Sequence, residues 1–149
     1  MMSAPRSVLF VCEHGAAKSV LAASYFNALA RRAGLSWVAR ARGTAPDVTV
    51  FPAVASGLAA EGVALCQTRP EALQPGDLTR ADLIVSFDQP GVAAGGPESA
   101  RVVAWDALPP VSADYGQASQ AIFERVDALI RDLTEGNQMR DARSWRIWD

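Results

Sequence analysis

The stretch VLFVCEHGAAKS, from Val8 to Ser19, decides the fold class. Its first four residues form a short apolar run of β-formers, which is typical of a strand buried on both faces. From Lys18 to Arg32 apolar residues recur at helical spacing, and Gly34 is placed to end that helix. The stretch therefore predicts a strand, a tight loop and a helix, with Cys12 at the carboxyl end of the strand.

The remaining chain continues this alternation of strands and helices. We expect further strands over 37–41, 82–87 and 101–105, and helices over 52–61 and 114–133. Residues 66–80 read as a loop with one short helix, and the Gly/Pro-rich residues 89–97 as a mobile loop. Alternating elements joined by right-handed crossovers indicate a mainly parallel sheet. We predict a single α/β domain over residues 1–149, with a core over about 8–133 and a C-terminal tail over 134–149.

Composition excludes several classes of protein. The chain has 149 residues, of which 50% are hydrophobic and 20% are charged, as in ordinary globular domains. A net charge of −2 excludes a basic nucleic-acid surface, and no apolar run reaches the roughly 20 residues of a membrane span. Two cysteines, Cys12 and Cys66, are too few for a disulfide framework. We expect a cytoplasmic protein that binds neither nucleic acid nor membrane and uses no metal or other cofactor.

The loop after Cys12 has the features of an anion site. Backbone N–H groups of a tight loop converge on one point, and the positive end of the following helix faces it, which favours a thiolate and a tetrahedral oxyanion. Such sites lie at the carboxyl ends of strands in open parallel sheets. The only lysine, Lys18, and the only histidine, His14, fall in the same eight residues, 12–19. This loop is therefore the first candidate site.

These residues resemble the low-molecular-weight protein tyrosine phosphatases and the related thioredoxin-coupled arsenate reductases. Their signature after the first strand is Cys, five residues, Arg and Ser; here it reads Cys12, five residues, Lys18 and Ser19. The resemblance covers about residues 8–133 and continues in the segments ARGT (41–44), FPA (51–53), EGV (61–63) and ADLIV (81–85). It implies a four-stranded parallel sheet flanked by helices, a flavodoxin-like three-layer sandwich. It also implies a thiolate that attacks phosphorus or arsenic.

The resemblance implies a role for each residue of the loop. Cys12 would be the nucleophile, Ser19 the hydrogen-bond donor to its thiolate, and Lys18 the cation over the equatorial oxygens of the oxyanion. The residues between them are expected to bind the substrate: Glu13, His14, Gly15, Ala16 and Ala17.

The loop departs from the family pattern at several positions. Lys18 stands where the family has arginine; arginine binds a phosphate through two parallel N–H groups, whereas lysine offers one charge on a flexible stem. Looser positioning is costly in phosphoryl transfer. Glu13 is expected at the rim, where it favours substrates with cationic surroundings, and Gly15 replaces asparagine in a turn that allows positive φ. For His14 three roles stay open: a rim hydrogen-bonder, a proton donor, or an exposed residue without a role.

The proton donor to the leaving group is the hardest residue to assign. The family uses an Asp-Pro pair shortly before the last helix, and this chain has none. Asp106 precedes Tyr115 by the family's loop length and is the candidate acid, with Ala107 in place of proline. Asp114 is expected to cap the last helix, because Gln117 follows it at capping-box spacing.

Cys66 is the second thiol of the chain. The reductases of the family use further cysteines after the third strand, and residues 86–97 contain none. We expect Cys66 to be half-buried and apolar in character. A resolving role is the alternative and requires its loop to fold over Cys12.

The sequence is compatible with three functions. The leading one is a phosphatase of phosphotyrosine or small phosphate monoesters that works through a cysteinyl-phosphate. The alternatives are arsenate reduction through Cys12 with an external thiol, and binding of phosphate or a phosphoprotein without turnover. The partner is thus a phosphorylated protein or a small oxyanion. In the tail, Trp145 and Trp148 are expected to dock on the domain, with a homodimer contact as the alternative.

Overall fold

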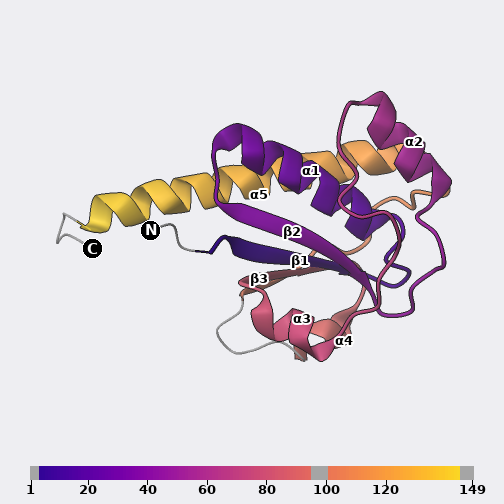
Figure 1. Ribbon diagram of the computed structural model, residues 1–149, viewed down its shortest axis with the longest axis horizontal. Coiled ribbons are helices and arrows are strands. Elements are labelled where there is room, and N and C mark those ends of the chain that lie inside the picture. Colours follow the sequence, from indigo (N-terminus) through magenta and orange to yellow (C-terminus); the bar gives the residue numbers. More distant parts are fainter. Residues whose placement is uncertain (1–3, 95–100, 145–149) are drawn as a thin grey trace.

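The computed structural model describes residues 4–94 and 101–144. The order of elements confirms the alternation predicted from the sequence (Figure 1). The elements are β1 (Arg6–Cys12), α1 (Lys18–Ala33), β2 (Trp37–Gly43), α2 (Pro52–Ala60), α3 (Pro75–Arg80), β3 (Leu83–Ser86), α4 (Pro90–Ala94), β4 (Arg101–Ala104) and α5 (Tyr115–Ser144).

The strands form one four-stranded parallel sheet in the order β2-β1-β3-β4. Helices α1 and α5 cover one face, and α3 and α4 lie against the other (Figure 1). The predicted four-stranded parallel sheet flanked by helices is therefore confirmed. Cys12 of β1 pairs with Gly43 of β2, and Val11 of β1 pairs with Ser86 of β3. The carboxyl ends of these three strands consequently meet at one edge of the sheet.

Phe10 of β1 lies at the centre of the main core. Its ring centroid is 6.1 Å from that of Phe26, 6.3 Å from that of Phe87 and 5.7 Å from that of Trp105. Side chains alternate along a strand, so Cys12, two residues later, faces the same side as Phe10. The strand thereby delivers the thiol to the face covered by α1 and α5.

Helix α5 is longer than the sequence predicts. It begins after Asp114, whose Oδ1 accepts the N–H of Gln117 at 3.0 Å and so caps the helix as expected. The prediction ended the helix at residue 133, where its apolar face ends, but the helix continues to Ser144. The segment TEGNQMRDARS (134–144) contains no proline and several strong helix formers, which allow the helix to continue beyond the apolar pattern of its first part.

The segment after β3 is partly helical. The loop predicted over 89–97 contains the short helix α4, which begins at Pro90 and buries Val92 against Leu78 and Ile84. The predicted docking of Trp145 and Trp148 concerns residues outside the described ones. Among the helices of the described residues, none combines the length and apolarity needed to cross a membrane.

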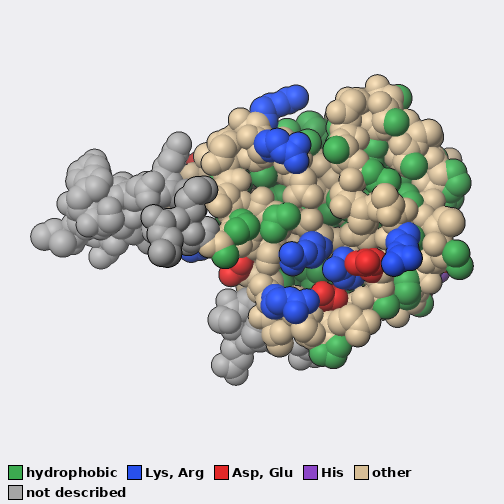
Figure 2. Space-filling model, in the orientation of Figure 1, with side chains coloured by type: hydrophobic (Ala, Val, Ile, Leu, Met, Phe, Trp, Pro, Cys, Tyr) green, Lys and Arg blue, Asp and Glu red, His purple; other side chains and the backbone are tan. Residues whose placement is uncertain are grey.

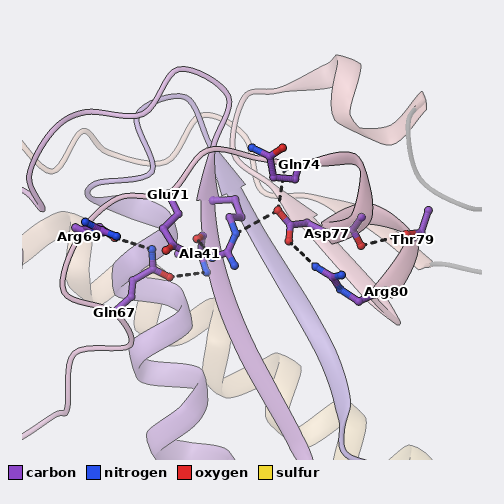
Figure 3. A network of polar contacts seen from close by, with 10 residues as sticks. Ala41, Gln67, Arg69, Glu71, Gln74, Asp77, Thr79 and Arg80 are labelled. Carbon is purple, nitrogen blue, oxygen red and sulfur yellow. Dashed lines mark hydrogen bonds and ion pairs between the residues drawn. The ribbon is translucent and has the colours of Figure 1, made fainter.

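The outer edge of β2 is bonded mainly by side-chain amides. The Asn27 amide donates to the carbonyl of Ala39 at 3.2 Å and accepts its N–H at 2.8 Å. The Gln67 amide oxygen accepts the N–H of Ala41 at 3.3 Å (Figure 3). A single bridge between Gly43 and Ala72 follows. These bonds satisfy backbone groups that an edge strand otherwise leaves unpaired.

Candidate active site

Two hydrogen-bonding groups lie at the Cys12 sulfur, one from its own loop and one from α1. The N–H of Gly15 donates to Cys12 Sγ at 3.2 Å, and Ser19 Oγ lies 3.1 Å from the same sulfur. A thiolate can only accept hydrogen bonds, so the Ser19 hydroxyl is the donor when Cys12 is ionised. Ser19 itself is completely buried, which fixes this hydroxyl in place. The predicted pair of Cys12 and Ser19 is thus brought together.

A cavity of about 470 Å³ opens over Cys12. It is lined by residues of the four segments 12–18, 47–51, 87–89 and 110–112, each of which follows one of the four strands. The wall is mixed: Phe51, Phe87 and Val111 supply apolar surface, and charged residues lie nearer the rim. A small anion with an aromatic or aliphatic body fits such a lining.

The Cys12 loop is fixed from outside by the segment after β2. The carbonyls of Cys12 and Glu13 accept the N–H groups of residues 44 and 45 at 3.1 and 2.7 Å. The carbonyls of His14 and Ala16 accept those of residues 47 and 51 at 3.0 and 2.9 Å. Gly15 sits at the top of the turn with φ +60°, the conformation expected from the sequence. The loop is therefore held rigidly by main-chain bonds that do not depend on its side chains.

Behind this segment, an ion-pair network holds residues 67–80 on β2. The buried Asp77 carboxylate accepts bonds from Arg42 Nε at 3.2 Å, the Gln74 N–H at 2.9 Å and Arg80 at 3.3 Å (Figure 3). Arg42 also pairs with Glu71 at 3.2 Å. Figure 2 shows basic side chains gathered over this face with acidic ones between them. This network holds the carboxyl end of β2 from the side opposite the Cys12 loop.

Lys18 begins α1, as predicted, and lines the cavity. Its Nζ lies 3.5 Å from Asp88 Oδ2. Asp88, which follows β3 at the same edge of the sheet, is not among the residues predicted from the sequence. The rule that sites gather at the carboxyl ends of parallel strands was the signal that could have found it.

The rim of the cavity is acidic. His14 lies between two carboxylates, with Nε2 3.0 Å from Glu13 Oε2 and Nδ1 3.4 Å from Asp47 Oδ1. All three side chains are more than half exposed, at 57%, 58% and 56% for His14, Glu13 and Asp47. Glu13 is thus at the rim, where the sequence placed it.

Asp106 has other contacts than those expected of a proton donor. Its Oδ1 accepts the N–H of Asp88 at 2.8 Å. It is not among the described residues that line the cavity, and of the loop after β4 Pro110, Val111 and Ser112 form that wall. Its predicted role as the acid stays a prediction.

Cys66 lies apart from the cavity lining. It is half-buried, its N–H donates to Ser24 Oγ at 3.0 Å, and its Sγ is 3.8 Å from the Val20 carbonyl oxygen. Burial raises the pKa of the Cys66 thiol. Across the described residues, no group of three or more His, Cys, Asp and Glu side chains is arranged to hold a metal. The cavity lining includes the Cys12 thiol and the Lys18 ammonium group.

Comparison with known proteins decides the family. The model of the low molecular weight phosphotyrosine protein phosphatases matches residues 7–94, which is more than half of the chain. The chain belongs to this family. Among curated protein sequences, none matches significantly.

Solved structures of similar fold include phosphatases and arsenate reductases. A low molecular weight protein tyrosine phosphatase from T. tengcongensis is 20% identical with a TM-score of 0.75, over 85% of this chain and 99% of that chain. An arsenate reductase from Archaeoglobus fulgidus is 29% identical with a TM-score of 0.65, over 83% and 98%. A thioredoxin-dependent arsenate reductase from Corynebacterium glutamicum is 24% identical with a TM-score of 0.68; the match covers 94% of this chain but 65% of that chain. Solved structures similar to this chain thus include both phosphatases and arsenate reductases.

Proposed function

We propose that this member of the family hydrolyses phosphate monoesters, with Cys12 as the nucleophile. The observation that supports this most directly is the position of the Cys12 sulfur. It accepts the Gly15 N–H at 3.2 Å, lies 3.1 Å from Ser19 Oγ and forms part of the cavity wall. A thiolate held by donors at the floor of a rigid anion loop is the arrangement that nucleophilic attack on a phosphoryl group requires.

The reaction takes two steps at this sulfur. The Cys12 thiolate attacks phosphorus, the P–O bond to the ester breaks, and the leaving oxygen takes up a proton. Water then attacks the cysteinyl-phosphate, the S–P bond breaks, and inorganic phosphate and the thiolate are released. The loop amides and Lys18 stabilise the equatorial oxygens in both steps. Asp106 stays the predicted source of the first proton, although its carboxylate bonds to the N–H of Asp88 in this conformation.

The lining of the cavity favours a phosphorylated aromatic side chain or a small phosphate monoester. Phe51, Pro110 and Val111 offer apolar contacts to the body of the substrate. Glu13 and Asp47 at the rim are negative and favour phosphate groups with cationic residues nearby. A phosphotyrosyl peptide flanked by lysine or arginine is therefore the substrate class that we expect to be turned over best.

The experiment compares wild type, Cys12→Ser and Cys66→Ser on p-nitrophenyl phosphate and on a phosphotyrosyl peptide. We expect turnover by wild type and Cys66→Ser and none by Cys12→Ser. If wild type and Cys12→Ser are equally inert, the phosphatase proposal is wrong. Thermal stabilisation by phosphate without turnover would then support a domain that binds oxyanions only.

Arsenate reduction is the second candidate, and the similarity to the Archaeoglobus fulgidus reductase favours it. Cys66 lies outside the cavity lining, so an external thiol has to supply the electrons that reduce arsenate to arsenite. Arsenate turnover with glutathione or thioredoxin tests this activity. Absence of turnover with both donors counts against it.

A further inference from the structure

Asp88, which lines the cavity, and Ala107, in the loop after β4, have an unusual backbone conformation. Asp88 has φ +56° and Ala107 has φ +60°, and they are the non-glycine residues with positive φ in the described part of the chain. This region is unfavourable for residues with a Cβ, and more so for alanine than for aspartate. Asp88 follows β3 and Ala107 follows β4, which are neighbouring strands. Strain of this kind persists only where the surrounding contacts enforce it.

The contacts that enforce it are reciprocal. The N–H of Asp88 donates to Asp106 Oδ1 at 2.8 Å, and the N–H of Ala107 donates to Asp88 Oδ1 at 3.1 Å. Each aspartate thus binds the backbone of the other loop. We call Asp88, Asp106 and Ala107 the aspartate clasp. Gln89 adds a third anchor, since its amide donates to the Asp88 carbonyl at 2.9 Å and accepts the Thr44 hydroxyl at 2.9 Å.

The aspartate clasp fixes the direction of one carboxylate. With Oδ1 of Asp88 bound to Ala107, Oδ2 of Asp88 lies 3.5 Å from Lys18 Nζ. Lysine has a long, flexible stem and lacks the rigid planar fork by which arginine is oriented. A fixed carboxylate limits the conformations of the ammonium group and keeps it at the cavity. We infer that Asp88 is a positioning residue for Lys18, and that Asp106 acts through Asp88. This inference rests on the proposed function.

The opposite role for Asp88 makes an opposite prediction. If Asp88 competes with the substrate for Lys18, its removal frees the cation and speeds turnover. If Asp88 positions Lys18, its removal slows turnover, even though a negative charge near a phosphate has been lost. The two roles are therefore separated by the sign of the change in kcat.

The decisive variant is Asp88→Asn. Asparagine tolerates positive φ and keeps an oxygen for the Ala107 N–H, but it removes the charge that faces Lys18. On p-nitrophenyl phosphate we expect kcat to fall by about 10- to 100-fold. The inhibition constant of inorganic phosphate should stay unchanged or fall, because the loss of a negative charge favours a bound anion.

Asp127→Asn on α5 is the control. It removes a negative charge from an exposed pair with Arg131 and should change neither kcat nor the inhibition constant of phosphate. An unchanged or raised kcat in Asp88→Asn overturns the inference.

A second readout does not depend on turnover. Lys18 is the only lysine of the chain, so lysine-labelled protein gives one side-chain NMR signal from the ε-methylene group. We expect restricted motion of this group in wild type and in Asp127→Asn, and free motion in Asp88→Asn. Equal motion in all three overturns the inference. If wild type is inert but the lysine signal responds, only the proposed function has failed.

Asp106 is tested by two substitutions. Asp106→Asn keeps an oxygen for the Asp88 N–H, whereas Asp106→Ala removes it. We expect Asp106→Ala to free the Lys18 signal as Asp88→Asn does, and Asp106→Asn to leave that signal as restricted as in wild type. A lower kcat of Asp106→Asn on phenyl phosphate, the poorer leaving group, reports proton donation by Asp106 and does not bear on positioning. Equal Lys18 signals in Asp106→Ala and wild type overturn the role of Asp106 in positioning.

Discussion

The backbones of Gly15 and Gly43 are in direct contact. A Cβ on Gly43 would lie 2.7 Å from the nitrogen of Gly15, and a Cβ on Gly15 would lie 2.8 Å from the nitrogen of Gly43. Gly43 is also held on its other side, since its N–H donates to the Glu71 carbonyl at 2.9 Å and its carbonyl accepts the Leu73 N–H at 2.9 Å. The strand end therefore has no freedom to yield, and any side chain added there must displace the Cys12 loop.

Gly43→Ala is expected to disturb both stability and the nucleophile. Overpacking of this kind costs about 1–3 kcal/mol of unfolding free energy. Chemical denaturation measures that loss, and the rate of Cys12 alkylation reports the displaced loop. Gly91→Ala is the control, because an added Cβ there meets nothing within 4 Å. Wild-type stability and alkylation rate in Gly43→Ala would show that the loop tolerates the extra atom.

The two thiols are expected to differ in reactivity. Burial raises the pKa of Cys66, so this thiol stays protonated and slow to react at neutral pH, and its reactivity increases only as the solution becomes alkaline. Cys12 is in the cavity wall beside two hydrogen-bond donors. Iodoacetamide at pH 7 should therefore label Cys12 first, as peptide mapping by mass spectrometry will reveal. Preferential labelling of Cys66 would contradict this assignment.

Tyr25 links stability to alkaline pH. Its hydroxyl donates to both carboxylate oxygens of Glu61, at 3.0 and 2.9 Å, and burial and this carboxylate raise the pKa of Tyr25. Because the pKa is higher in the folded state, the stabilisation is complete below the unfolded value of about 10 and is lost as the pH rises above it. Tyr25→Phe should lose about 1 kcal/mol at pH 8. Urea unfolding between pH 8 and 11 should then give a shallower decline for Tyr25→Phe than for wild type; parallel curves would exclude Tyr25 as the cause.

Lys18→Arg tests whether turnover is limited by having lysine where the family has arginine. A guanidinium group can bind an oxyanion through two parallel N–H groups, so we expect kcat/KM on p-nitrophenyl phosphate to rise by about tenfold. Lys18→Met, which keeps the stem without the charge, should lower it. If kcat/KM of Lys18→Arg equals that of wild type, the lysine is already positioned well enough and does not limit turnover.

Much of this architecture could be predicted from local pattern. The apolar run before Cys12, the helical spacing after Lys18 and the glycine at residue 34 correspond to β1, α1 and its end within about two residues. The C-terminal part of α5 could not be predicted, because the signal for a helix was its apolar face and residues 134–144 have none.

The parts of the site that could not be predicted from the sequence are those that depend on strand order. Lys18 and Asp88 are brought together because β3 lies beside β1, and the sequence does not state which strands are neighbours. The choice of Asp106 rests on loop length and on the capping role of Asp114. Both arguments locate a residue along the chain, but neither gives the direction of its carboxylate. That direction follows from the N–H of Asp88, a contact across 18 residues.

The amides of Asn27 and Gln67 along β2 bear on how this molecule behaves at high concentration. An unpaired strand edge is a template on which another chain can add, and stacking of copies in this way leads to fibres. Because backbone groups of Ala39 and Ala41 already have hydrogen-bond partners, this edge of the sheet offers an incoming strand few free N–H and C=O groups. Loss of the Asn27 amide would expose the template, and self-association would then compete with folding.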